Sequence, residues 1–174
     1  ALPDLKAALL ADPANQALRF TCARIHEQKG ERNEAVQFYR DILRADAKSV
    51  PALNNLAMLL MEDASTLNDA QRHAEQAFTV DGRNPAVRDT LALVYMKLGR
   101  YTEALQLLEA AFKAQADNGD ILLHLIEAQL GADKAEDARA SWADFLRLFP
   151  DKATSNAALG LRARLETVPA RNKP

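Results

Sequence analysis

Apolar, small and acidic positions recur along this chain with a period of 34 or 35 residues. An acidic residue followed by alanine marks the period at four places: Glu34-Ala35, Asp69-Ala70, Glu103-Ala104 and Asp137-Ala138. Two further series keep the same spacing: Leu5, Tyr39, Ala74, Leu108, Trp142, and Ala8, Ile42, Ala77, Ala111, Phe145. Periods of this size are typical of stacked helix pairs. The pattern therefore predicts an all-α chain in which pairs of amphipathic helices repeat.

A polar series with the same spacing marks the start of each pair. Its members are Asn15, Ser49, Asn84 and Asn118. Their side-chain oxygens can accept from the unpaired N–H groups at a helix start. Gly30 and Gly99 fall between the two helices of a pair, where a left-handed backbone is commonly needed. The small alanines after the acidic residues let two helices approach closely, so we expect these series to form the core.

These residues resemble the tetratricopeptide repeat, whose pattern is W-x2-L-G-x2-Y, then A-x3-F, then P. The clearest copy runs Leu91-Ala92-x-x-Tyr95, Gly99-Arg100-Tyr101, Ala104 and Leu108. The resemblance implies an all-α fold, a right-handed α-solenoid of stacked antiparallel helix pairs. It also implies a protein or peptide partner and no cofactor.

Matching the series divides the chain into a partial repeat, four full repeats, a cap and a tail: 1–15, 16–49, 50–84, 85–118, 119–152, 153–166 and 167–174. We place the one extra residue of the second repeat within Glu62–Asn68. Residues 1–15 match a second helix, Pro13 included, so we expect that a longer array was cut. On the cap we expect Asn156, Arg162 and Arg164 to face solvent. The cut would leave three leucines partly uncovered: Leu2, Leu5 and Leu9.

In this family the first helices line a concave groove, and the register of the repeats implies which residues are exposed there. The predicted partner-binding residues are Phe20, Arg24, Glu27, Asn54, Met58, Met61, Asp89, Leu93, Met96, Lys97, Leu123 and Glu127, with Gln28, Glu62 and Leu130 beside them. All three methionines of the chain fall on this face, and methionine recurs on adaptable binding surfaces. Apolar residues flanked by mixed charges suit an amphipathic helix or an extended peptide. Ordinary packing between helices is the competing interpretation of the methionines.

Charge and composition narrow the class of partner. The net charge of −2 leaves no excess of positive charge for a polyanion, so nucleic acid is not a predicted partner. No apolar run approaches the roughly 18 residues that span a bilayer, so direct membrane insertion is not predicted.

The histidines and the single cysteine do not predict a catalytic or metal site. Cys22 and His26 occupy core positions, and His73 should face solvent. His124 and Glu127 share a helix face without a second such motif to complete a metal site.

We therefore predict a non-catalytic scaffold that holds a peptide or helix of a partner in its groove. Residues 54–111 are also similar to bacterial cell-envelope lipoproteins of exopolysaccharide and protein-sorting systems, through Asn54-Asn55-Leu56-Ala57 and Asn84-Pro85-Ala86-Val87. This similarity favours a periplasmic or envelope location over the cytoplasm. A clamp for chaperone C-terminal carboxylates is not predicted, because only Arg24 and Asn55 remain of its five polar groups. Two alternatives stay open: a substrate-selecting region attached to a catalytic domain such as a glycosyltransferase, and a structural element that self-associates through exposed terminal helices.

Overall fold

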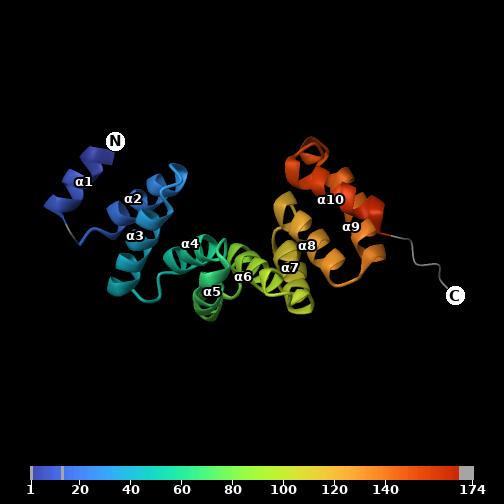
Figure 1. Ribbon diagram of the computed structural model, residues 1–174, viewed down its shortest axis with the longest axis horizontal. Helices are drawn as coiled ribbons and strands as arrows, with labels where there is room; N and C mark the ends of the chain where they lie inside the picture. Colours follow the sequence, from blue (N-terminus) through green and yellow to red (C-terminus); the bar gives the residue numbers. More distant parts are fainter. Residues whose placement is uncertain (1, 13, 169–174) are drawn as a thin grey trace. The chain divides into compact units, whose positions relative to one another are not determined.

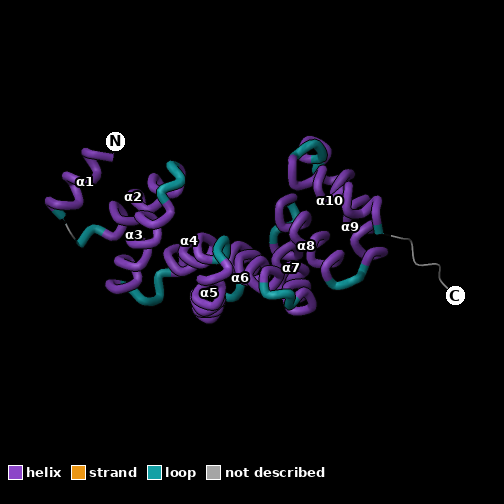
Figure 2. The backbone as a smooth tube through the Cα atoms, in the orientation of Figure 1, coloured by secondary structure: helices purple, strands orange, loops and turns teal. Residues whose placement is uncertain are grey.

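The computed structural model describes residues 2–12 and 14–168, and these residues form helices and loops without a strand (Figure 1, Figure 2). This agrees with the all-α class that the period predicts. The chain separates into two compact units, Ala1–Asp81 and Gly82–Pro174. The predictions for the Leu2 side chain, for Pro13 and for residues 169–174 of the tail lie outside the described residues.

Unit 1 holds five α-helices and one short 3-10 helix among the described residues, and each α-helix packs on the next along the chain. They are α1 (Leu2–Ala11), α2 (Gln16–Gln28), α3 (Arg32–Ala45), α4 (Val50–Leu60), η1 (Ala64–Thr66) and α5 (Leu67–Asp81). The 3-10 helix lies where the extra residue of the second repeat was placed. The Asp63 side chain begins it by accepting from the backbone N–H of Ser65 at 2.8 Å.

Unit 2 is also helical, and its helices α6 to α9 follow the same pairing. Its described elements are α6 (Pro85–Lys97), α7 (Tyr101–Ala114), α8 (Gly119–Gly131), α9 (Ala135–Leu148), η2 (Pro150–Lys152) and α10 (Asn156–Thr167). The last helix starts at Asn156 rather than at residue 153, because Ser155 caps it by accepting from the N–H of Ala158 at 3.2 Å. Helix α10 packs on α8 and α9.

Three of the four predicted caps form. The Asn15 side chain accepts from the N–H of Leu18 at 3.0 Å, and those of Asn84 and Asn118 cap α6 and α8 in the same way. The prediction is wrong for Ser49, whose side chain makes no cap hydrogen bond. Pro51 stands at the second position of α4 and has no N–H, so one of the two donors that a cap would use is missing.

The turns inside the helix pairs follow the glycine prediction. Gly30 and Gly99 have φ angles of 73° and 74°, the left-handed region that glycine adopts without strain. Between α8 and α9 the same type of turn is made by Asp133, with φ 57°. A residue other than glycine therefore closes the last pair.

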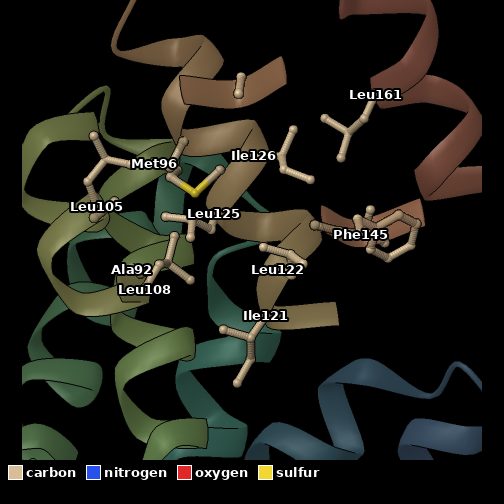
Figure 3. Packing of buried hydrophobic residues seen from close by; sticks show 14 of the residues in the cluster. Ala92, Met96, Leu105, Leu108, Ile121, Leu122, Leu125, Ile126, Phe145 and Leu161 are labelled. Atoms are coloured by element: carbon tan, nitrogen blue, oxygen red, sulfur yellow. The ribbon is translucent and has the colours of Figure 1, made fainter. Parts of the chain in front are cut away.

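The predicted small-residue positions lie in the core. The alanines that follow the acidic residues are fully buried: Ala35, Ala70, Ala104 and Ala138. In unit 2, α8 is at the centre of a cluster to which α6, α7, α9 and α10 also contribute (Figure 3). Figure 3 shows Leu161 of α10 and Phe145 of α9 directed toward the α8 residues Ile126 and Leu122. Helix α8 is apolar on several sides because four helices, α6, α7, α9 and α10, pack on it.

Candidate functional site

The predicted contact residues differ widely in exposure. Arg24, Met58 and Lys97 are exposed. A second group is partly buried, and its members are Phe20, Glu27, Asn54, Asp89, Leu93 and Glu127. These nine side chains offer surface to a partner.

The prediction of an exposed face is wrong for three residues. Met61, Met96 and Leu123 retain only 6%, 9% and 4% of their accessible surface. Met96 and Leu123 belong to the core cluster of unit 2, where apolar side chains of adjacent helices meet. The packing interpretation of the methionines therefore holds for Met61 and Met96, and Met58 alone of the three is exposed.

In unit 1 a chain of hydrogen bonds joins three helices through a buried tyrosine. The Tyr39 hydroxyl of α3 donates to Glu27 of α2 at 2.9 Å and accepts from Asn55 of α4 at 3.0 Å. The Phe20 ring meets the Tyr39 ring edge-on, with 5.6 Å between centroids. Burial is the main reason that the pKa of Tyr39 is raised, so the hydroxyl stays protonated. Two predicted contact residues, Phe20 and Glu27, thus also support the packing of unit 1.

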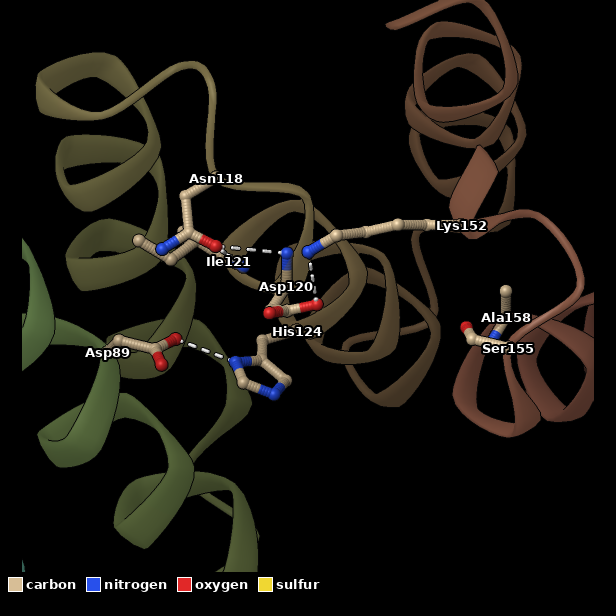
Figure 4. Close-up of polar contacts among 8 residues, drawn as sticks. All are labelled: Asp89, Asn118, Asp120, Ile121, His124, Lys152, Ser155 and Ala158. Atoms are coloured by element: carbon tan, nitrogen blue, oxygen red, sulfur yellow. Dashed lines mark hydrogen bonds and ion pairs between the residues drawn. The ribbon is translucent and has the colours of Figure 1, made fainter. Parts of the chain in front are cut away.

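In unit 2 the first helices of successive pairs meet at polar side chains (Figure 4). Asp89 of α6 lies 2.7 Å from the imidazole Nδ1 of His124 on α8. Burial lowers the pKa of His124, but the Asp89 hydrogen bond and the nearby carboxylates of Glu127 and Asp120 outweigh it, so the pKa is raised. The surroundings of His124 are therefore electronegative.

Two ion pairs connect α8 with the segment that follows α9. Lys152 of η2 donates to Asp120 at 2.9 Å, and Arg164 of α10 donates to Glu127 at 2.9 Å. All four side chains retain 43% or more of their accessible surface. Asn156, Arg162 and Arg164 are exposed as expected, and the Arg164 side chain also reaches across to α8. Exposed pairs of this kind are weak and exchange readily with other charges.

Between α8 and α10 lies a hollow of about 500 Å³, which we call the α8–α10 hollow. Its apolar lining comes from Leu123, Ala157, Gly160 and Leu161. Its polar lining comes from Asp120, His124, Glu127, Asn156 and Arg164. A Cβ added to Gly160 would meet nothing within 4 Å, so there is open space beside this glycine. The arrangement is an apolar depression with charged side chains along its edge.

The remaining histidines and the cysteine lie in the core. Cys22 and His26 are buried as predicted, and His26 stacks on Phe38 while its Nδ1 lies 2.5 Å from Glu31. The prediction that His73 faces solvent is wrong, since only 9% of it is exposed. Burial lowers the pKa of His73. Within residues 2–12 and 14–168, no group of histidine, cysteine and carboxylate side chains is arranged to hold a metal ion.

A model of the tetratricopeptide repeat family matches residues 1–60, 63–117 and 95–165. The chain belongs to the tetratricopeptide repeat (TPR) family. Members of this family are generally non-catalytic scaffolds for protein–protein interaction. No helix in the described part of this TPR protein is long and apolar enough to cross a membrane.

Solved structures with the same fold include several TPR proteins. A thermophilic TPR protein from Thermus thermophilus is 22% identical, with 95% of this chain and 87% of that chain covered and a TM-score of 0.73. YrrB, described as a TPR protein with an unusual peptide-binding site, is 17% identical, with 95% and 86% covered and a TM-score of 0.73. MamA of Desulfovibrio magneticus is 13% identical, with 89% and 86% covered and a TM-score of 0.76. Among curated protein sequences, none matches this chain significantly.

The groove prediction omitted the residues that make the hollow polar. Asp120, His124 and Arg164 were not among the predicted contact residues, although Glu127 beside them was. One signal was available, because Asp89 and His124 are 35 residues apart, within one residue of the 34-residue period of the repeats that hold them. The Glu127–Arg164 pair could not have been found this way, because it depends on how close α10 packs to α8.

Proposed function

We propose that this TPR protein is an interaction scaffold that binds a peptide or helix of a partner protein on the exposed face of its first helices. The observation that carries the proposal is the α8–α10 hollow, an apolar depression edged by charged side chains. Grooves that bind peptides combine an apolar pocket for an anchoring side chain with polar groups that orient the ligand. YrrB, a neighbour with the same fold, is described as having a peptide-binding site.

In unit 1 the proposal rests on α2 and α4. Arg24 and Met58 are exposed there, while Glu27 and Asn54 are half-buried. In unit 2 it rests on Asp89, Leu93, Lys97 and Glu127, together with the lining of the hollow. We also propose that the repeats run over 16–49, 50–84, 85–118 and 119–152, with 153–166 as the capping segment.

The similarity of residues 54–111 to envelope lipoproteins supports an assembly in the bacterial cell envelope as the setting. The partner test should therefore treat soluble and envelope fractions of the source cells separately. A partner recovered only from the soluble fraction would contradict the envelope setting and leave the scaffold proposal intact.

The scaffold proposal is tested by a pull-down with the chain and four single variants. Met58→Lys and Leu93→Lys place a charge on the proposed binding face of units 1 and 2. Val80→Lys and Leu146→Lys are the matched controls, because Val80 and Leu146 lie on second helices and are 43% and 42% exposed. The helicity of each variant is checked by circular dichroism.

We expect a partner retained by the parent and both controls, and lost with at least one groove variant. Equal retention by all five proteins would move the binding surface away from the first helices. If neither the parent nor any variant retains a protein, the scaffold proposal for this chain is contradicted. Light scattering on the same samples tests the alternative of self-association.

A further inference from the structure

The charged side chains around the α8–α10 hollow indicate which ligand charge it favours. The carboxylates of Asp120 and Glu127 line it, and that of Asp89 lies next to it against His124. Two permanent cations, Lys152 and Arg164, pair with the two lining carboxylates. The same three carboxylates also raise the pKa of the His124 imidazole, so they favour a positive charge at this position. The charge that complements this site is therefore positive.

The two cations leave the carboxylates available to a ligand. Lys152 and Arg164 are 44% and 49% exposed, and their carboxylate partners Asp120 and Glu127 are 67% and 43% exposed. A lysine or arginine of a ligand can replace either cation in an equivalent geometry. Such an exchange replaces one exposed ion pair with another, so it selects the ligand but adds little affinity.

Affinity must then come from the apolar part of the hollow. Leu123 and Leu161 are buried beneath it, and Ala157 and Gly160 are small. The absence of a Cβ at Gly160 leaves room that a larger residue at this position would occupy. A branched apolar side chain of a ligand would cover the two leucines there and be removed from water.

We infer that the α8–α10 hollow binds a peptide segment in which an apolar side chain such as leucine is flanked by lysine or arginine. The inference rests on the proposed scaffold function and names the chemistry of its partner. The leucine enters the space beside Gly160. The flanking cations pair with Asp120 and Glu127 at the two ends of the hollow.

The test uses the full chain and three fluorescein-labelled peptides of about nine residues in a serine–glycine background. The first carries a central leucine with two lysines on each side, the second has glutamates in place of the lysines, and the third has serine in place of the leucine. We expect the first to bind at least about tenfold more tightly than either of the others by fluorescence anisotropy at low salt. Equal or tighter binding of the glutamate peptide would overturn the inference, as would no binding of the lysine peptide up to about 1 mM.

Variants of the hollow locate the binding. Gly160→Phe fills the space and should weaken binding of the lysine peptide at least about tenfold. The matched control Ala163→Phe adds the same side chain at an exposed position of α10 that does not line the hollow, and its affinity should stay within about threefold of the parent. Asp120→Asn combined with Glu127→Gln should abolish the preference for lysine over glutamate. The double variant does not change the packing of α10 on α8. It therefore tests whether the peptide binds to the hollow even if Gly160→Phe disturbs the fold. Unchanged binding by both variants would overturn the inference.

The two proposals fail in different ways. If the pull-down retains a partner that Met58→Lys or Leu93→Lys loses, but the lysine peptide does not bind, the scaffold function stands and the chemistry assigned to the hollow is wrong. If the peptide binds to the hollow as described, that assignment stands even where the pull-down finds no partner.

Discussion

At single positions in unit 2, two helical glycines have opposite surroundings. A Cβ at Gly131, the last residue of α8, would lie 2.2 Å from Cε1 of the Tyr101 ring. A Cβ at Gly160 would meet nothing within 4 Å. The first glycine permits close approach of α7 to α8, and the second leaves a space open at the hollow.

Gly131→Ala is therefore expected to destabilise the protein. The Tyr101 ring must move out of its packed position, which costs about 1–3 kcal/mol for overpacking of this kind. Gly160→Ala is the control and should be neutral or stabilising by up to about 1 kcal/mol, because alanine is the better helix former. Urea unfolding of both variants measures the difference. Equal stabilities would contradict the close approach at Gly131.

Two histidines respond to pH with opposite sign. The pKa of His124 is raised when folded, so its contribution to stability is fully present below its unfolded pKa and is lost as the pH rises through the folded value. The pKa of His73 is lowered by burial, so its contribution is present above the unfolded pKa and is lost as the pH falls. The effects of the two residues partly cancel in the parent protein.

Single variants should separate the pH-dependent contributions of His124 and His73 to stability. The loss of stability caused by His124→Gln should be larger at about pH 5.5 than at about pH 8.5, on either side of the ordinary histidine pKa near 6.5. The loss caused by His73→Leu should be larger at the higher of the two pH values. Urea unfolding of the parent and both variants at each pH gives the comparison. A pH-independent loss in either variant would show that its histidine does not change its pKa on folding.

At the scale of the helix, N-cap residues that look equivalent in the sequence differ in how much they contribute to the free energy of unfolding. Asn118→Ala removes a side chain that accepts from the N–H groups of Asp120 and Ile121 at the start of α8. We expect a loss of about 0.5–2 kcal/mol, as for other cap deletions. Ser49→Ala should cost much less, because Ser49 makes no cap hydrogen bond. Thermal or urea unfolding of the pair tests this, and equal costs would contradict the assignment of the caps.

The last helix is expected to protect the apolar side of α8. Buried Ala158, Leu161 and Leu165 face the core cluster of unit 2 from α10. A chain that ends at residue 154 should unfold at a lower temperature and self-associate, because apolar surface of α8 and α9 becomes exposed. A chain that ends at residue 168 keeps α10 and is the control. Unchanged melting and an unchanged state of association in the shorter chain would contradict the capping role.

At the scale of the whole molecule, stability should follow from packing between neighbouring helices rather than from one central core. The 17 buried residues of the core cluster in unit 2, from Ala92 to Leu165, all lie within that unit. Residues 82–168 alone should therefore give a helical circular dichroism spectrum and a cooperative urea transition. A fragment of 101–168 lacks α6, which packs on α7 and α8, and should lose cooperativity. A non-cooperative transition in the longer fragment would contradict the independence of unit 2.

Much of the architecture was determined by the sequence alone, because a period of 34 or 35 residues can bury its small and apolar positions only by stacking helix pairs. The buried alanines, the left-handed Gly30 and Gly99 and three of the four caps are local or periodic features, so they were predictable. Only the tertiary structure decided the rest. Met96 is buried and Arg164 reaches Glu127 because side-chain exposure depends on how closely adjacent helices approach. The space beside Gly160 depends on the same spacing, and no single helix encodes it.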